Sequence, residues 1–438
     1  MKILISSRVK WSLVFIAILI FVYGIIFFFQ KGNEKPGVVE IYFADRVTAA
    51  HKVLIDKYNM MMRGKVKVIP IDFPNFDFST NERKEVLARS LRGMGDGIDL
   101  YAVDVVWVQR FAKWSEPLDK YFTEEEKKRI LPQALASCYS GGELVATPLD
   151  LVQGVLYYRE DLLKKVDNGD RIIEKIKNGI TWEELIKLNS QINLNNPFYV
   201  FPAADYEGFM CSFMELLLSQ EPDYFDKYGF TFDNPVAEKA LQTIVDFIYK
   251  YKITPETVLK FTEIPSYQYY VKNNGLFLHG WPSYDKDFME SPFDTAKEKY
   301  LKKAPLPYFE SGHPASIVGG WNLMVSKFSN KKKEVVDFIK FMLQDDSQEI
   351  FYYTSSYFPV INKIYNDPSY LKKYPQILEI KNLLKTCVHR PFHSEYTRYS
   401  KIMSNYFEQA MKKQIPVKEA LIKATTAIQL ERTAVKDF

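Results

Sequence analysis

The chain has 438 residues, which is long enough for two domains or for one domain with large insertions. Hydrophobic residues make up 47% of it and aromatic residues 15%, including 32 Phe and 29 Tyr, so large buried cores can form. The formal net charge of +4 is small for this length. No basic stripe with interleaved aromatic residues occurs, which argues against a nucleic-acid partner.

Motifs for metals, phosphates and activated nucleophiles are absent from the sequence. Its three cysteines and five histidines form no CxxC or HExxH pattern, and neither a GxxxxGK[ST] loop nor a GxSxG turn occurs. We therefore expect no metal, no cofactor and no catalytic residues. The cysteines, at Cys138, Cys211 and Cys387, are too far apart to indicate a disulfide framework, although one pair could still form a bridge.

Residues 1–30 differ from the rest of the chain. Lys2, Arg8 and Lys10 precede an uncharged run from Trp11 to Gln30. As a helix this run would span roughly 30 Å, the thickness of a bilayer core. The positive residues before it favour an N-terminus in the cytoplasm and a body on the extracytoplasmic side. The sequence thus predicts an uncleaved membrane anchor, with a cleaved signal peptide as the alternative.

A short polar tether at 31–37 leads into alternating strand and helix patterns. Strands are predicted at 38–43, 66–71 and 98–103, with helices at 48–61 and 81–94 between them. This alternation indicates a parallel sheet covered by helices, with ligands at the carboxyl ends of the strands. The segments at those ends contain Asp45 and Arg46, residues 73–78, and Asp104 to Trp107.

Several stretches after residue 150 combine glycine with aromatic residues. Residues 154–163 read GVLYYREDLL, residues 206–208 read YEG, residues 275–285 read GLFLHGWPSYD, and the stretch from 319 begins Gly-Gly-Trp. After the last of these comes a short strand pattern and then an amphipathic helix over 335–342. Thr181 and Glu184 have the spacing of a capping box, which predicts a helix start there.

In their order and spacing, these motifs resemble the family 1 extracellular solute-binding proteins of sugar ABC importers, in the branch that binds trehalose or maltose. The resemblance covers about residues 38–430. It implies an α/β fold of two lobes joined by crossing segments, with a ligand cleft between the lobes. The predicted parts are an anchor at 1–30, a tether at 31–37, first-lobe segments at 38–148 and 314–364, a second lobe at 149–313, and C-terminal helices at 365–438, mainly in the second lobe.

The resemblance also implies ligand-binding residues. Carboxylates would accept sugar hydroxyl hydrogen bonds, an arginine would donate to sugar oxygens, and aromatic rings would stack on apolar sugar faces. The alternatives are a helix cap for Asp104 and core packing for the aromatic residues. The candidates are Asp45, Arg46, Asp104, Trp107, Gln153, Tyr206, Glu207, Trp281, Tyr284, Gly320, Trp321 and Arg390.

One position departs from the family pattern. Relatives that bind trehalose or maltose usually carry an acidic residue two positions before Gly154, where this chain has Val152 followed by Gln153. We therefore expect weak binding of these two sugars and a preference for a less polar or differently linked saccharide.

The function that the resemblance implies is capture of a sugar and its delivery to the permease subunits of an ABC importer. Two alternatives remain. A membrane-tethered sensor would present the bound sugar to a receptor. A carbohydrate-active enzyme would need two carboxylates across the scissile bond, for which Asp104 and Glu207 are the only pair we can nominate.

Overall fold

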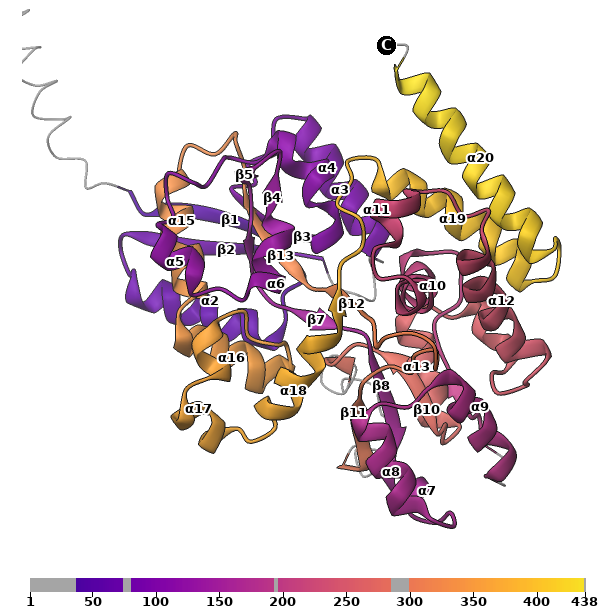
Figure 1. Cartoon of the computed structure of the whole chain (residues 1–438). Coiled ribbons are helices and arrows are strands. Elements are labelled where there is room, and N and C mark those ends of the chain that lie inside the picture. Colours follow the sequence, from indigo (N-terminus) through magenta and orange to yellow (C-terminus); the bar gives the residue numbers. More distant parts are fainter. Residues whose placement is uncertain (1–36, 74–79, 193–195, 285–298, 437–438) are drawn as a thin grey trace, which may run out of the picture.

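The chain folds into two α/β lobes, which Figure 1 shows side by side. The computed structural model describes residues 37–73, 80–192, 196–284 and 299–436. The sheet of lobe 1 has the order β2-β1-β3-β13-β6. Its strands are β1 (Val39–Asp45), β2 (Val66–Asp72), β3 (Leu100–Asp104), β13 (Trp321–Val325) and β6 (Thr147–Pro148).

The directions of these strands bring several candidate residues to one edge of the sheet. β2 and β3 run parallel to β1, which confirms the predicted parallel sheet, whereas β13 runs antiparallel to β3. An antiparallel strand begins where its parallel neighbours end, and Trp321 at the start of β13 pairs with Asp104 at the end of β3. Asp45 ends the neighbouring strand, so all three lie at the same edge.

Helices cover both faces of this sheet. Thr48 caps α2 (Ala49–Met61) by accepting a hydrogen bond from the backbone N–H of His51. The apolar faces of α2 and α15 (Lys332–Met342) meet over the sheet, where Tyr58 packs on Phe338 with ring centroids 4.9 Å apart. Lobe 1 also contains α3 (Thr80–Arg92), α4 (Val108–Phe111), α5 (Glu124–Lys128), α6 (Pro132–Leu135) and α16 (Asp345–Ser355).

Lobe 2 is built on a sheet of order β11-β8-β10-β9. Its strands are β8 (Val155–Arg159), β9 (Tyr199–Val200), β10 (Phe277–Gly280) and β11 (Leu301–Ala304). The predicted capping box is confirmed at the start of α9 (Trp182–Gln191). The other helices are α7 (Glu160–Leu163), α8 (Gly169–Asn178), α10 (Glu207–Gln220), α11 (Tyr224–Tyr228), α12 (Pro235–Tyr249), α13 (Glu263–Lys272), α19 (Tyr396–Met411) and α20 (Val417–Lys436).

A small sheet of order β14-β12-β7 joins the lobes. Its strands are β7 (Val152–Gln153), β12 (Ser316–Gly319) and β14 (Cys387–Val388), each of which belongs to a segment that crosses from one lobe to the other. The third crossing segment, with β14, follows residue 365, the predicted start of the C-terminal helices. Helices α17 (Pro368–Lys373) and α18 (Ile377–Leu383) pack with η6 (Asn362–Tyr365) on the lobe 1 side.

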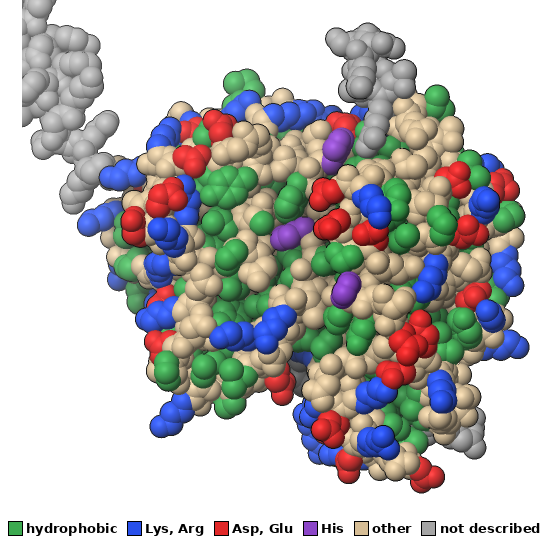
Figure 2. Space-filling view, in the orientation of Figure 1, with side chains coloured by type: hydrophobic (Ala, Val, Ile, Leu, Met, Phe, Trp, Pro, Cys, Tyr) green, Lys and Arg blue, Asp and Glu red, His purple; other side chains and the backbone are tan. Residues whose placement is uncertain are grey.

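The described part of the chain contains no helix that is long and apolar enough to cross a membrane. The predicted anchor, residues 1–30, and most of the tether lie outside that part. All three cysteines are free thiols, and Cys138 and Cys211 are buried. Across the surface visible in Figure 2, acidic and basic side chains are interspersed.

Candidate functional site

Three charged residues from distant parts of the chain meet between the lobes. The Arg390 guanidinium donates to Asp104 Oδ1 from Nη2 and to Glu207 Oε1 from Nη1, each at 2.8 Å. Asp104 ends β3 in lobe 1, whereas Glu207 begins α10 in lobe 2, so Arg390 bridges the two lobes. The sequence nominated all three residues, and the structure brings them together in what we call the bridging triad.

The bridging triad is largely buried, and burial strengthens the attraction between its charges. The Arg390 side chain is only 3% exposed, and its carboxylate partners are 16% exposed at Asp104 and 13% at Glu207. Burial alone would lower the pKa of Arg390, but the two carboxylates raise it well above its ordinary value. Arg390 is therefore a fixed cation between two carboxylates that remain partly open to solvent.

Hydroxyl groups of α19 hold the second carboxylate in place. Glu207 accepts a hydrogen bond from Tyr396 at 2.6 Å and another from Ser400. Asp104 also caps η1 (Val105–Trp107) by accepting from the backbone N–H of Val106 at 3.0 Å. The helix-cap alternative for Asp104 is thus correct, and it coexists with the bond to Arg390.

Trp321 lies beside the bridging triad because two glycines precede it. Gly320 has φ +123°, and a Cβ there would lie 2.6 Å from the carbonyl oxygen of Asp150, so no larger side chain fits. The indole of Trp321 is half-buried, and the guanidinium of Arg83 lies 3.9 Å from its centroid. One face of this ring is therefore already occupied by a cation–π contact.

Trp107, by contrast, is a core residue. Its side chain is 2% exposed and meets Trp321 edge to face, with ring centroids 6.3 Å apart. Lys84 lies 5.1 Å from the centroid of the Trp107 ring. Trp107 therefore packs in the core against the ring of Trp321, in agreement with the core-packing alternative. Contact between Trp107 and a ligand stays a prediction.

On the lobe 2 side, Trp281 and Tyr284 have different environments. Trp281 is half-buried and approaches the crossing segments, since a Cβ on Gly319 would lie 3.1 Å from its ring and 3.0 Å from the side chain of Val152. Tyr284 is 3% exposed and stacks on Tyr157 at 6.2 Å. Trp281 is thus the aromatic residue of this segment with an accessible ring, and Tyr284 belongs to the core.

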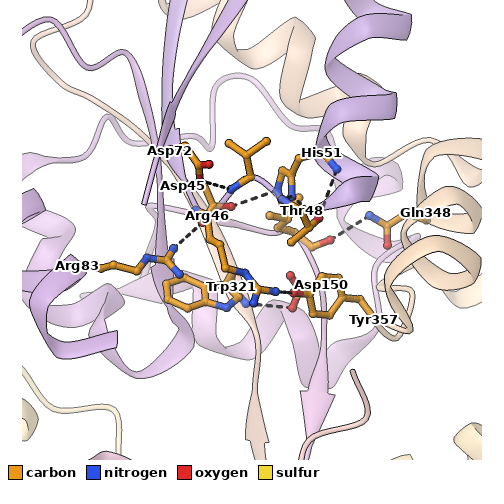
Figure 3. A network of polar contacts seen from close by, with 12 residues as sticks. Asp45, Arg46, Thr48, His51, Asp72, Arg83, Asp150, Trp321, Gln348 and Tyr357 are labelled. Atoms are coloured by element: carbon orange, nitrogen blue, oxygen red, sulfur yellow. Dashed lines mark hydrogen bonds and ion pairs between the residues drawn. The ribbon is translucent and has the colours of Figure 1, made fainter. Parts of the chain in front are cut away.

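Figure 3 shows the polar network at the end of β1. The Asp45 carboxylate contacts Arg83 at 2.6 Å and His51 at 3.1 Å, and it also accepts from the backbone N–H of Arg46. Burial alone would raise the pKa of Asp45, but the bond to His51 and the nearby charges hold it below its usual value. These partners give Asp45 a structural role.

Arg46 is more accessible than Asp45. Its guanidinium donates to the hydroxyl of Tyr357, and its side chain is only partly buried. In Figure 3 it lies next to Trp321 and Asp150. The predicted strand-end segment after β2, residues 73–78, lies outside the described residues except for Phe73.

Gln153 is buried in the hinge. Its amide donates to the Leu383 carbonyl at 3.0 Å and accepts from the Cys387 thiol at 2.9 Å. Burial raises the pKa of this thiol to about 12, so the thiol remains protonated and able to donate. Gln153 thus ties the first crossing segment to the third, and the side chain that approaches Trp281 is that of Val152 instead.

A third carboxyl group, that of Glu263, lies close to the two carboxylates of the bridging triad. Glu263 begins α13, and its carboxyl lies near the hydroxyl of Tyr206, the residue that precedes α10. Burial, with a smaller contribution from Asp104, raises the pKa of Glu263 to about 7. Tyr206 is a candidate from its motif, whereas Glu263 was missed, because its position after Thr262 at a helix start is typical of capping.

Other neighbours of the site were missed as well, since they belong to no motif. Arg83 and Lys84 lie inside α3, and Tyr396 and Ser400 lie on the inner face of α19. Only the helical spacing of Tyr396 and Ser400 could have shown that both face the same side. Within the described ranges, no group of His, Cys, Asp and Glu side chains could hold a metal ion.

Comparison with known proteins agrees with this geometry. A probable ABC transporter-binding protein of Deinococcus radiodurans is 29% identical over 342 residues, which cover 76% of this chain and 78% of the relative. Maltose-bound MalE3 of T. maritima superposes with a TM-score of 0.78 at 27% identity, covering 90% of this chain and all of that structure. The GacH receptor of Streptomyces glaucescens shares the fold, with a TM-score of 0.74 at 20% identity over 92% of this chain and 99% of that one.

The family assignment rests on a match to more than half of the chain. Residues 65–349, which include most strands of both lobe sheets and two of the three crossings, match the family described as bacterial extracellular solute-binding protein. The predicted resemblance and the two-lobe α/β fold are thereby confirmed. The chain belongs to the bacterial extracellular solute-binding proteins.

Proposed function

We propose that this protein captures a neutral saccharide between its lobes and delivers it to the permease subunits of an ABC importer. The observation that carries the proposal is the bridging triad, in which Arg390 joins Asp104 of lobe 1 to Glu207 of lobe 2 beside the half-buried Trp321. The maltose bound to the T. maritima protein supports this chemical class of ligand, and the Deinococcus relative, a probable ABC transporter-binding protein, supports the partner.

The geometry suits a sugar for two reasons. Asp104 and Glu207 each have a carboxylate oxygen beyond the one that binds Arg390, and both side chains are partly open, so they can accept hydrogen bonds from sugar hydroxyls. The rings of Trp281 and Trp321 approach the same region from the two lobes and offer apolar faces. A saccharide that contacts both lobes stabilises their closed arrangement.

The proposed ligand contacts are the partly exposed candidates and two buried positions next to them. The partly exposed ones are Arg46, Asp104, Tyr206, Glu207, Trp281 and Trp321, joined by the missed residue Glu263, and the buried ones are Arg390, which binds Asp104 and Glu207, and Gly320, which precedes Trp321. Asp45, Trp107, Gln153 and Tyr284 are buried among structural partners, so we assign them supporting roles.

Binding without chemistry is the activity that these contacts support. A glycosidase needs one carboxyl group as a proton donor and a second as a base or nucleophile. Here both members of the nominated pair, Asp104 and Glu207, bind the same buried guanidinium, so each already has a structural partner. A membrane-tethered sensor would use the same binding site. Measuring uptake of the saccharide distinguishes an importer subunit from a sensor.

The proposed location is the extracytoplasmic side of the cell membrane, with residues 11–30 as the anchor. The support is the uncharged run of twenty residues behind three cations, together with a family that works outside the cytoplasm. N-terminal sequencing of the membrane-bound protein tests this, and a mature start near Lys31 would contradict it.

A saccharide screen by thermal shift, followed by titration calorimetry, tests the function. A ligand at 100 times its dissociation constant adds about 2.7 kcal/mol of stability. At roughly 2.1 cal/mol/K of unfolding entropy per residue over about 400 residues, this raises the melting temperature by about 3 °C. A matched pair of variants, Asp104→Asn within the site and Asp119→Asn outside it, should lose and retain binding respectively. If no saccharide binds, or if new reducing ends appear, the proposal is wrong.

A further inference from the structure

Apart from the binding site, one surface of lobe 1 combines exposed methionines with exposed cations. Met60 is 78% exposed and Met61 60% exposed at the end of α2. Lys57 lies one helical turn earlier, and Arg63, Lys65 and Lys67 follow in the turn and in β2. We call these six residues the basic methionine patch.

The four cations of this patch are available for an external partner. All four are exposed, and in the described part of the chain none of them forms an ion pair. The exposed carboxylates nearest in the sequence and in the sheet register are Asp56 and Glu40, so cations outnumber carboxylates. Methionine side chains are flexible and adapt to irregular apolar surroundings, and an exposed apolar pair beside cations is typical of surfaces that bind membranes.

The patch also lies where the chain leaves toward its apolar run. The backbone N–H of Val39, at the start of β1, donates to the carbonyl of Lys65 at 2.9 Å. Only residues 31–37 separate the uncharged run from the body, and even a fully extended chain of this length spans at most about 25 Å. An anchored body must therefore keep the basic methionine patch close to the bilayer.

From these observations we infer that the basic methionine patch docks on the anionic surface of the membrane in which the chain is anchored. This inference rests on the N-terminal anchor proposed above and is independent of which sugar binds. Met60 and Met61 enter the headgroup region, and Lys57, Arg63, Lys65 and Lys67 contact lipid phosphates. Docking holds lobe 1 against the membrane and leaves lobe 2 free to move.

The test uses the full-length chain reconstituted into vesicles of phosphatidylcholine, with or without phosphatidylglycerol. Acetylation of each lysine is read by mass spectrometry. With the anionic lipid present, acetylation of Lys57, Lys65 and Lys67 should fall by roughly fivefold at each lysine that the membrane surface holds. High salt should restore the acetylation. Lys177 on α8 and Lys187 on α9 lie exposed in lobe 2 and should label equally in both vesicles.

Two pairs of variants complete the design. Lys57→Glu with Lys65→Glu should remove the protection of Lys67, and Met60→Asn with Met61→Asn should weaken it. The charge-matched control, Lys177→Glu with Lys187→Glu, should leave it unchanged. Retained saccharide binding shows that each variant is folded.

Three results would overturn the inference. They are equal labelling of the patch in both vesicles, an equal fall at the control lysines, and protection in neutral vesicles that grows with protein concentration and so indicates a second copy of the chain. Loss of saccharide binding with intact lysine protection would count against the proposed function alone. Intact binding without protection would count against docking alone.

Discussion

Replacing Arg390 by methionine removes the cation that joins Asp104 to Glu207 and leaves two carboxylates facing each other in a largely buried place. Breaking a buried ion pair by deleting one partner costs about 3–5 kcal/mol, because the remaining charges lose their compensation. The Arg390 side chain is 3% exposed, so the full range applies. With an unfolding entropy of roughly 2.1 cal/mol/K per residue over about 400 residues, the melting temperature should fall by about 4–6 °C.

Differential scanning calorimetry on matched variants measures this effect. Arg398→Met is the control, since Arg398 is half exposed and pairs with Glu395 at 3.3 Å, so its loss should cost less than about 1 kcal/mol. Adding Asp104→Asn and Glu207→Gln to Arg390→Met should recover most of the lost stability. If Arg390→Met melts no lower than Arg398→Met, the bridging triad does not stabilise the joined lobes and our interpretation of it is wrong.

Three further predictions concern the rings of Trp321 and Trp107, the titration of Glu263, and Val152. Trp321→Ala should weaken saccharide binding in calorimetry by about 1–3 kcal/mol, whereas Trp107→Ala should mainly lower stability, by about 3–5 kcal/mol. If Trp321→Ala lowers only stability and Trp107→Ala only weakens binding, Trp321 does not stack on the ligand. Since the pKa of Glu263 is raised to about 7 in the folded chain, its stabilising contribution is full below about pH 4.3 and is lost as the pH rises to about 7. Glu263→Gln should therefore flatten the fall of the melting temperature over that interval, and an unchanged slope would contradict this. Val152→Asp should raise the affinity for trehalose and maltose, and tight binding by the unmodified chain with no change in the variant would show that Val152 does not face the ligand.

The sequence by itself determined the local elements of the fold. Alternating strand and helix patterns predicted β1, β2 and β3 to within a residue or two, because side-chain periodicity and caps act over short distances. Thr181 and Glu184 set the start of α9 in the same way. The Gly-Gly-Trp stretch also indicated the turn that directs Trp321, since only glycine fits against Asp150 with the φ of Gly320.

Tertiary structure decided which of these residues form the site. Asp45 and Asp104 look alike in the sequence, since each ends a parallel strand of lobe 1. Yet Asp45 is held by Arg83 and His51 within its own lobe, whereas Asp104 meets Arg390, 286 positions away. Contacts over such separations depend on how two lobes pack, and no local periodicity encodes them.

The same reason explains the other differences. Gln153 follows Val152 directly, but the hinge sheet turns its amide toward Cys387 and Leu383, so Val152 is the side chain that approaches Trp281. Helices α17 and α18 have patterns compatible with either lobe, and only their packing on η6 places them with lobe 1. Local patterns therefore determined the elements and their chemistry, and the packing of distant segments determined which side chains face the space between the lobes.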